Sequence, residues 1–294
     1  MTTRAASAPS DELLLAAFRD ASRRVLRAFS SSFFLVTRFL PPEKRASVEI
    51  IYAAVRYPDE IVDTFPLSPR EKIDALANWE SHYVRALAIE GSRERLRIGT
   101  PWILAGFAEV VRRAGIPEQH YLDFLAAMRR DAEPARFATL DDLIDRYVYG
   151  SAIVVGYFLA HVYGTAPGAS MQDAYRCAAD LGIALQLTNF ARDISEDSGR
   201  GRVYVPQDVP VFNGAAYLAR AAEQRYVRAS RDLPVFAEDC RPAMRACIEV
   251  YRSLNGQILR EPQAARQSVP AREKFGALPP SKYWRVPLAY LGAL

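Results

Sequence analysis

The sequence predicts an all-α fold, and three features of the chain lead to this prediction. Apolar residues recur with helical spacing along most of the 294 residues, and no run alternates apolar and polar residues as a half-buried strand does. Glycine and proline stand between the periodic segments, as in Gly115-Ile116-Pro117. Half of the residues are hydrophobic and 24% are charged, which is an ordinary composition for a globular protein with a large core.

The expected helices begin and end at such breaks. Ser10 or Asp11 can cap the first helix, which ends near Phe29. Pro42 suits the first turn of the second helix, which continues toward Asp63. We expect the remaining helices at about residues 68–91, 102–115, 117–131, 140–163, 172–196, 212–231, 235–260 and 280–292.

Composition narrows the class of protein. Residues 1–10 lack periodicity and are expected to be disordered, whereas residues 11–294 are expected to form one domain, because no linker-like stretch divides them. The net charge is +4, but no dense Lys/Arg run with interleaved aromatic residues is present, so nucleic acid is not an expected partner. The three cysteines (Cys177, Cys240 and Cys247) have no metal-ligand spacing and favour a reducing compartment. No signal-peptide core and no apolar run of membrane-spanning length is evident, so a cytoplasmic protein is expected.

The stretch from Leu181 to Pro206, LGIALQLTNFARDISEDSGRGRVYVP, organises the second half of the chain. Apolar residues cover most sides of its helical part, which predicts a buried helix. Buried charge without a partner is very costly, and a hydrated cation would be an economical partner. Two carboxylates four residues apart are oxygen ligands of the kind that Mg²⁺ accepts. The alternative is a surface helix whose carboxylates face water. The polar residues of this stripe have the spacing i, i+3, i+7, i+11 and are Gln186, Asn189, Asp193 and Asp197.

The helix that ends near Asp63 repeats this pattern. Tyr52, Arg56, Asp59 and Asp63 lie on one stripe, and the last two are again a carboxylate pair four residues apart. Arg56 can pair with Asp59 or grip a phosphate through both guanidinium edges. An exposed helix end is the alternative. If the two stripes faced each other across a cavity, they would hold several divalent ions, which serve to bind and ionise a diphosphate leaving group.

Together these motifs resemble the squalene and phytoene synthase family. The family pattern Arg-x-x-Asp-x-x-x-Asp matches the first stripe, and Gln-x-x-Asn-x-x-x-Asp-x-x-x-Asp matches the second. SSFFLVTRFLPPEKR is similar to the family's N-terminal Ser-Phe segment, and YVYGSAIVVG (147–156) is similar to its Tyr-x-Tyr helix. The resemblance extends from about residue 20 to the last expected helix.

The resemblance implies an isoprenoid synthase bundle around one central cavity. It also implies an Mg²⁺-dependent prenyltransferase that condenses two geranylgeranyl or farnesyl diphosphates head to head. The reaction would pass through a cyclopropylcarbinyl diphosphate to phytoene, squalene or a related linear terpene. NADPH would be needed only if squalene were the product. The run SGRGRVYVPQD resembles the bacterial phytoene-type members.

The resemblance also assigns roles to individual residues. Mg²⁺ would be held by four aspartates, Asp59, Asp63, Asp193 and Asp197, and phosphate charge would be neutralised by Arg56, Arg192 and Arg202. The leaving group would accept hydrogen bonds from the amides of Gln186 and Asn189. Cationic intermediates would be faced by Tyr52, Tyr147 and Tyr251, and the substrate would be contacted by Ser32 and Phe33.

Two other function classes stay open from the sequence. A terpene cyclase or a head-to-tail prenyltransferase on the same bundle would share the aspartate chemistry and would be expected to carry an Asp-Asp-x-x-Asp motif, a spacing that this chain has only at Asp141, Asp142 and Asp145, outside the two stripes. An inactive helical scaffold is the second alternative. Release of pyrophosphate that depends on magnesium would exclude the scaffold.

Two positions depart from the family pattern. Pro58 precedes Asp59 where relatives carry a helix-compatible residue, and it is expected to kink the helix at Tyr57. Ile153 stands where many relatives have glycine, so a larger side chain would narrow the pocket.

The last expected helix has an interfacial pattern. Trp284, Leu288 and Leu291 stand beside Lys282 and Arg285. This pattern predicts peripheral association with the inner face of the membrane. The alternative is that the helix packs on the bundle.

Overall fold

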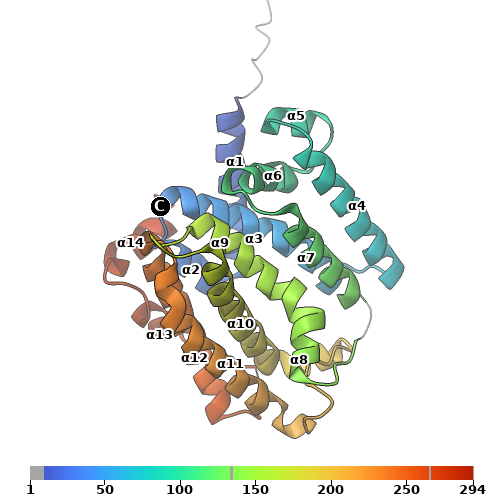
Figure 1. The fold of residues 1–294 in the computed structure, drawn as a ribbon, viewed down its shortest axis with the longest axis vertical. Coiled ribbons are helices and arrows are strands. Elements are labelled where there is room, and N and C mark those ends of the chain that lie inside the picture. The colour runs from blue at the N-terminus through green and yellow to red at the C-terminus, as the bar shows by residue number, and fades with distance from the viewer. Residues whose placement is uncertain (1–9, 133–134, 265, 294) are drawn as a thin grey trace, which may run out of the picture.

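The computed structural model describes residues 10–132, 135–264 and 266–293, and within these ranges the protein is a helical bundle without a β-strand (Figure 1). The predicted all-α class is therefore confirmed. A single isolated bridge joins Thr165 to Phe236. The first half contains α1 (Asp11–Phe29), α2 (Ser31–Thr37), α3 (Pro42–Asp63), α4 (Pro69–Leu87), α5 (Ser92–Arg97), α6 (Trp102–Ala114) and α7 (Glu118–Asp131).

The second half is built around one long helix. This helix, α10, packs against α9, α11, α12 and the π-helical segment η1, and Figure 1 shows it near the centre of the bundle. In chain order the elements are α8 (Leu140–Leu143), η1 (Ile144–Ile153), α9 (Val154–Tyr163), α10 (Met171–Gly199), η2 (Val211–Asn213), α11 (Gly214–Asp232), η3 (Leu233–Val235), η4 (Glu238–Cys240), α12 (Arg241–Arg260), α13 (Ala271–Gly276) and α14 (Lys282–Tyr290).

Local sequence fixes the ends of several helices. The Ser10 hydroxyl accepts a hydrogen bond from the backbone of Leu13, so Ser10 caps α1 rather than ending a disordered segment. Residues 1–9 lie outside the described ranges. Ser170 and Asp173 form a capping box at the start of α10, which begins one residue before its expected start.

Other boundaries differ from the prediction. Three short helices, α2, α5 and α13, lie in stretches expected to be irregular. Six or seven residues contain too few helical repeats to give a clear apolar period. α12 begins at Arg241 rather than near residue 235, because two 3₁₀ turns precede it.

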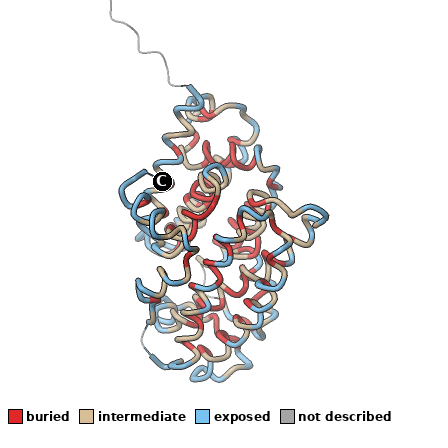
Figure 2. The backbone as a smooth tube through the Cα atoms, turned by 90° about the vertical axis from the view of Figure 1, so that its left-hand side faces the viewer, coloured by how far each residue is buried: buried red, intermediate tan, exposed pale blue. Residues whose placement is uncertain are grey.

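The helical stretch Leu140–Tyr163 also differs from expectation. It is long and apolar enough to cross a membrane by length and composition, although the sequence suggested no such run. Half of its most apolar window is buried inside the bundle, where it packs against α7 and α10. Its apolarity is therefore explained by its place in the core, and Figure 2 shows such buried residues along the inner faces of the helices.

The buried side chains form two large clusters. The larger joins α8 to α12 with parts of α2 and α3, and the smaller joins α3, α4, α6, α7 and α9. Both α3 and α9 contribute to each cluster, so these two helices connect the halves of the molecule. The polar stripe of α3 therefore lies on a helix that is held firmly from two sides.

α3 continues through Pro58 to Asp63. A proline at this position cannot donate to the carbonyl of Ala54 one turn earlier. The Tyr121 hydroxyl of α7 donates to that carbonyl instead, at 2.7 Å, and itself accepts a hydrogen bond from Trp79 Nε1 at 2.9 Å. α3 therefore remains one helix through any bend at Tyr57, because a side chain of α7 hydrogen-bonds to the Ala54 carbonyl that Pro58 leaves without its helical donor.

Candidate active site

The stripe on α3 is an ion-pair network. Arg56 donates to Asp59 at 2.5 Å and also pairs with Glu60. Its Nε is buried and has no hydrogen-bond partner among the residues described. The guanidinium also lies over the ring of Phe29, 4.6 Å from its centroid. Arg56 is therefore held beside Asp59 and keeps one donor unused.

The stripe on α10 carries a second network. Arg192 donates to Asp193 through Nε at 2.8 Å, and Arg266 reaches the same carboxylate from the chain segment after α12 at 3.0 Å. Arg266 also pairs with Glu196 at 3.2 Å. One and two turns before Asp193, the amides of Asn189 and Gln186 are half-buried and have no side-chain hydrogen bond to another described residue.

Arg202 links the segment after α10 to the ends of α3 and α7. It lies in the turn after α10, and its guanidinium pairs with Asp63 at 2.5 Å and with Asp131 at 3.7 Å. It also donates to the carbonyl of Val62 at 3.3 Å. Arg200, in the same turn, lies 3.7 Å from Asp63. The segment after α10 is thereby tied to the ends of α3 and α7.

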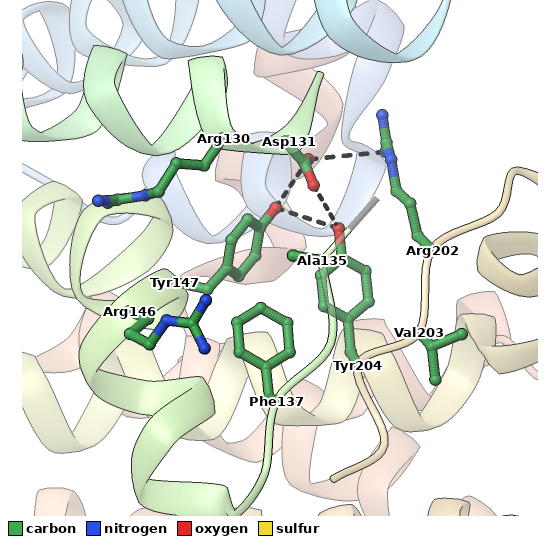
Figure 3. A pocket seen from close by; sticks show the side chains of 9 residues that line it. All are labelled: Arg130, Asp131, Ala135, Phe137, Arg146, Tyr147, Arg202, Val203 and Tyr204. Atoms are coloured by element: carbon green, nitrogen blue, oxygen red, sulfur yellow. Dashed lines mark hydrogen bonds and ion pairs between the residues drawn. The ribbon is translucent and has the colours of Figure 1, made fainter. Parts of the chain in front are cut away.

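A small cavity of about 30 Å³ opens beside this junction. Figure 3 shows the carboxylate of Asp131 facing the hydroxyls of Tyr147 and Tyr204, while the guanidinium of Arg130 points away. Both hydroxyls donate to Asp131 at 2.8 Å, and the two oxygens are 3.3 Å apart. The ring of Tyr204 stacks on Phe190 of α10 at a centroid distance of 4.0 Å.

A larger cavity of about 330 Å³ lies on the other side of Arg192. Ser32, Tyr251 and Lys274 line it together with Arg192 and Arg266. Its lining combines the apolar side chains of Val250, Leu254 and Val269 with three cationic groups and further polar side chains, so a ligand with an anionic head finds both charged and apolar contacts there.

Phe33 and Tyr52 form an aromatic pair between α2 and α3, with ring centroids 6.0 Å apart. Both also pack against the small hydrophobic cluster formed by Leu26, Phe34 and Ala289. Because Tyr52 belongs to the α3 stripe, this pair places Phe33 of α2 beside that stripe.

The aspartates of the two stripes are electrostatically crowded. Burial and the neighbouring charge of Asp63 raise the pKa of Asp59 to about 7, against the opposing effect of Arg56. The Asp59 side chain is nevertheless 36% exposed, so water reaches it. Burial and the charge of Asp193 raise the pKa of Asp197 to about 6. The charge of Asp63 at the end of α3 also raises the pKa of Asp197, so the two carboxylates are within electrostatic range of each other.

The tyrosines of the site are neutral phenols at physiological pH. Burial raises the pKa of Tyr52 to about 12, and burial also raises the pKa of Tyr251. For Tyr147, burial and the charge of Asp131 both raise the pKa. The three side chains can therefore offer ring faces and hydroxyl groups, but not phenolates, to a ligand.

The donor set fits Mg²⁺ in its chemistry. Mg²⁺ prefers carboxylate oxygens together with water and phosphate oxygens. The charges of Asp63 and Asp193 help to raise the pKa of Asp59 and of Asp197, and a divalent cation would relieve this repulsion. Across the described part of the chain, no three His, Cys, Asp or Glu side chains are close enough to hold a metal ion between them. Arginines contact Asp59, Asp63 and Asp193, and these pairs would have to open for a cation to bind.

The comparisons with known proteins decide the family. The squalene/phytoene synthase family model matches residues 26–211. The chain belongs to the squalene/phytoene synthase family. It is 30% identical to a 15-cis-phytoene synthase of Enterobacter agglomerans over 270 residues, covering 85% of this chain and 90% of the relative. It is 34% identical to a chloroplastic phytoene synthase 3 of Zea mays over 211 residues, covering 70% of this chain and 46% of the relative. The chain thus spans about half the length of the plant relatives it matches.

Solved structures share the fold. A dehydrosqualene synthase superposes with a TM-score of 0.74 at 21% identity, covering 97% of this chain and all of the other. A squalene synthase of Alicyclobacillus acidocaldarius gives a TM-score of 0.72 at 21% identity, covering 88% and 98%. The predicted isoprenoid synthase bundle is therefore confirmed.

Four residues of this squalene/phytoene synthase site escaped the sequence interpretation. Asp131 is a single aspartate at the end of α7 and belongs to no repeated stripe. Tyr204 and Arg200 lie in the turn after α10, and Arg266 lies in the segment after α12. Only folding brings them to the site. The turn sequence SGRGRVYVP was a partial signal, because it is part of the family resemblance.

Ile153 lies where the backbone of η1 comes close to the backbone of α10. It is buried at the end of η1, and the helix that faces it carries Gly182. A Cβ on Gly182 would lie 3.0 Å from the Ala152 carbonyl oxygen and 3.4 Å from the Ile153 Cα. On the adjoining turn, a Cβ on Gly156 would lie 2.9 Å from the Ala178 carbonyl oxygen of α10. Glycines from both helices thus let the two backbones touch.

Proposed function

We propose that this protein is a prenyltransferase that joins two prenyl diphosphates head to head and releases both diphosphates. The observation that carries the proposal is the pair of Asp/Arg stripes on α3 and α10, whose ends come together where Arg202, just after α10, pairs with Asp63 at the end of α3. Two carboxylate pairs with nearby arginines suit a ligand that combines divalent cations with phosphate groups. Membership of a prenyltransferase family supports the same chemistry.

In this proposal the residues of the stripes hold the diphosphates. Asp59, Asp63, Asp193 and Asp197 would hold Mg²⁺, which supplies positive charge to the leaving group when bound. Arg192, Arg202 and Arg56 would turn from the aspartates toward phosphate oxygens. The free amides of Gln186 and Asn189 would donate to the same group. Arg266 would add a further cation, since it already borders the larger cavity.

The aromatic side chains would shelter the hydrocarbon part. The first diphosphate leaves, the double bond of the second substrate attacks, and a proton is lost to give a cyclopropylcarbinyl diphosphate. The second diphosphate then leaves, the skeleton rearranges, and loss of a second proton gives the neutral hydrocarbon. The rings of Tyr52, Tyr147 and Tyr251 would stabilise the cations by about 1–2 kcal/mol per contact when water is excluded. Ser32 and Phe33 would contact the prenyl chain.

For the substrate we propose geranylgeranyl diphosphate, with phytoene as product. The similarity to a bacterial 15-cis-phytoene synthase over 90% of that protein supports this choice. Phytoene formation needs no reductant, whereas NADPH would be required if the product were squalene.

The decisive experiment supplies the purified protein with farnesyl or geranylgeranyl diphosphate and Mg²⁺, with and without NADPH. Pyrophosphate release and the mass of the extracted hydrocarbon are measured. We expect phytoene from geranylgeranyl diphosphate and no turnover in EDTA. A head-to-tail or cyclic product would point to the alternative chemistry on this bundle.

A matched pair of variants separates chemistry from folding. Asp193→Asn changes the proposed site, whereas Asp180→Asn changes the same helix away from it, where Asp180 pairs with Arg225 at 2.8 Å. We expect only the first to lose turnover while both keep native helix content. Full activity of Asp193→Asn would refute the proposed role of the stripe.

We further propose that the protein works in the cytoplasm at the membrane surface. The predicted interfacial residues of α14 are exposed, with Trp284 at 50%, Leu288 at 37% and Leu291 at 81%. A long hydrocarbon product partitions into lipid, so docking would ease its release. Flotation with liposomes should lift the intact protein but not a chain that ends at Pro280. If neither the intact protein nor the truncated chain binds to liposomes, the proposed membrane association is wrong.

A further inference from the structure

The three histidines of the chain are His82, His120 and His161, and folding brings two of them together. His120 lies in the first turn of α7, and His161 lies in the last turn of α9. Their ring centroids are 6.3 Å apart. α9 also packs against α10, which carries Tyr175 in its second turn. The two imidazoles and this phenol form a cluster that the proposed prenyltransferase reaction does not use.

The geometry of this cluster centres on one oxygen atom. Both imidazoles meet it through the same ring nitrogen, since His161 Nε2 lies 2.5 Å and His120 Nε2 lies 3.3 Å from the hydroxyl oxygen of Tyr175. The ring of Tyr175 packs against the ring of Tyr157, at a centroid distance of 4.3 Å. Because a phenol hydroxyl has one proton, it can donate to only one of the two nitrogens at a time. Two nitrogens of a metal-binding type, from two helices, therefore converge on a single point.

These distances are close to those of a metal centre. Zn²⁺ binds imidazole nitrogen at about 2.0–2.1 Å in tetrahedral geometry, which places neighbouring ligand atoms roughly 3.3 Å apart. One of the two contacts already has this length and the other is shorter, so small rotations of the side chains would admit an ion among the three atoms. A water molecule would be the fourth ligand. Two histidines and a tyrosine are compatible with the lack of any group of three His, Cys, Asp or Glu side chains in the described ranges.

Both imidazoles have the protonation state that metal binding needs. Burial, followed by the charge of His161, lowers the pKa of His120, against the opposing charge of Asp123. Burial also lowers the pKa of His161, against a hydrogen bond with the backbone of Ala114. Each ring is therefore neutral near pH 7, and a neutral imidazole binds a metal ion without first losing a proton. The backbone of Ala114 orients the ring of His161, as a second partner commonly does for metal-binding histidines.

The cluster is accessible and lies far from the aspartate stripes. His120, His161 and Tyr175 are each half-buried, so an ion can reach them from solvent. Tyr175 lies near the start of α10 and Asp193 lies near its end, roughly 27 Å away along the helix axis at about 1.5 Å per residue. Imidazole nitrogen suits Zn²⁺, Cu²⁺ and Ni²⁺, whereas carboxylate oxygen suits Mg²⁺. The cluster and the stripes therefore differ in both place and ligand chemistry.

We propose that His120, His161 and Tyr175 form a binding site for one divalent transition-metal ion, Zn²⁺ or an ion with the same ligand preference. The bound ion ties the start of α7 and the end of α9 to the start of α10. The site does not depend on the proposed prenyltransferase activity, because none of its three residues belongs to the two stripes.

The test measures Zn²⁺ binding to the full chain by isothermal titration near pH 7, with excess Mg²⁺ present to compete at the aspartate stripes. His120→Gln and His161→Gln should each bind Zn²⁺ at least ~10-fold more weakly, because even the loss of a residue that only orients a metal ligand costs about 10–100-fold. His82→Gln is the matched control, since His82 lies on α4 and contacts Arg85 instead of the cluster. It should keep the wild-type affinity. Any Zn²⁺ bound by the stripes contributes equally to all four proteins.

Co²⁺ gives a spectroscopic readout of the ligands. It absorbs visible light strongly in a four-coordinate site and weakly in a six-coordinate oxygen site, so the absorption band separates the cluster from the stripes. The band should appear with the wild type and with His82→Gln, and both other variants should lose it. Thiolates of the folded chain do not compete for the ion, because all three cysteines are buried: Cys177, Cys240 and Cys247.

Folding is checked separately by the helix content of each variant without metal. The two histidines lie on different helices, so a folding defect in one variant leaves the other as the test. If the folded His120→Gln or His161→Gln protein keeps both the wild-type Zn²⁺ affinity and the Co²⁺ band, the ion binds elsewhere and the proposal is wrong. A wild-type chain that shows neither saturable Zn²⁺ binding nor the Co²⁺ band would also overturn it, because the cluster would then be only a hydrogen-bonded contact between helices.

Discussion

Two regions of this molecule place a carboxylate among arginines, with opposite results. In α6, Glu109 accepts hydrogen bonds from Arg112 and Arg113 at 2.6 Å and from Arg95 at 3.2 Å. Burial alone would raise the pKa of Glu109, but these bonds lower it to about 2. At Asp59, burial and the charge of Asp63 raise the pKa to about 7 in spite of Arg56.

The difference lies in the ratio of charges. Three arginines surround the one carboxylate of Glu109, so the protein itself neutralises this negative charge. At the ends of α3 and α10 several carboxylates lie close enough to repel one another, and the arginines compensate only part of this charge. The first arrangement is typical of a structural ion pair, and the second is typical of a site completed by a ligand.

The largest expected effect is the loss of activity in Asp59→Asn. Removing this carboxylate should lower turnover at least ~100-fold, as the loss of a group that stabilises transition-state charge does. Without Mg²⁺, its urea midpoint should equal or exceed that of the wild type, because one repelling charge is gone. An equally large loss of stability would show that Asp59 is structural, and the comparison with Glu109 would fail.

Glu109→Gln should show the reverse. It leaves Arg95 buried without its counter-ion, so the free energy of unfolding should fall by about 3–5 kcal/mol. Turnover per folded molecule should be retained. Glu94→Gln is the matched control, since its pair with Arg97 is exposed and should contribute little to stability. If Glu109→Gln unfolds like this control, the α6 network does not stabilise the fold.

A smaller effect tests what holds Asp59 in place. Tyr121→Phe removes the donor to the Ala54 carbonyl that Pro58 leaves free, and should cost about 1–3 kcal/mol. In a Pro58→Ala background the helix regains its own donor, so the same change should cost about 1 kcal/mol less. The Pro58→Ala protein itself should fold, with activity reduced modestly or not at all. Equal costs in both backgrounds would contradict this account of the proline.

The smallest expected effect is a pH dependence from Glu109. Its pKa in the folded protein is about 2, below the ordinary value of 4.5, so the unfolded chain binds the proton first as the pH falls. The stabilisation by Glu109 is complete above pH 4.5 and declines as the pH falls from there toward 2. Between pH 6 and pH 3, the urea midpoint of the wild type should therefore fall further than that of Glu109→Gln. Parallel curves would mean that the Glu109 carboxylate is not stabilised in the fold.

The sequence predicted the parts of the site that repeat along one helix. Asp59 and Asp63, like Asp193 and Asp197, are four residues apart, so helical geometry alone places each pair on one face. Asp131 and Arg266 carry no such spacing. They reach the site because α7 ends there and because the segment after α12 folds back over α10, and both facts depend on tertiary packing.

The prediction of the fold from the sequence has the same limit: features that depend on tertiary packing could not be predicted. Long amphipathic helices were predictable because many residues repeat the same period. The π-helical turn of η1 was not, since its apolar residues fit the period of an ordinary helix over such a short stretch. The partner of Pro58 could not be predicted either, because Tyr121 lies 67 residues away from Ala54 in the chain.

The backbone contact of α10 with α9 and the end of η1 has a consequence for how this protein can evolve. Most helix pairs are separated by side chains, which can be exchanged for larger or smaller ones as the sequence drifts. At Gly156 and Gly182 no such spacer exists, because even one methyl group would press on a carbonyl oxygen of the opposite helix. Variation in this wall of the bundle must therefore come from neighbours such as Ile153. A saturation library should tolerate many residues there and almost none at the two glycines.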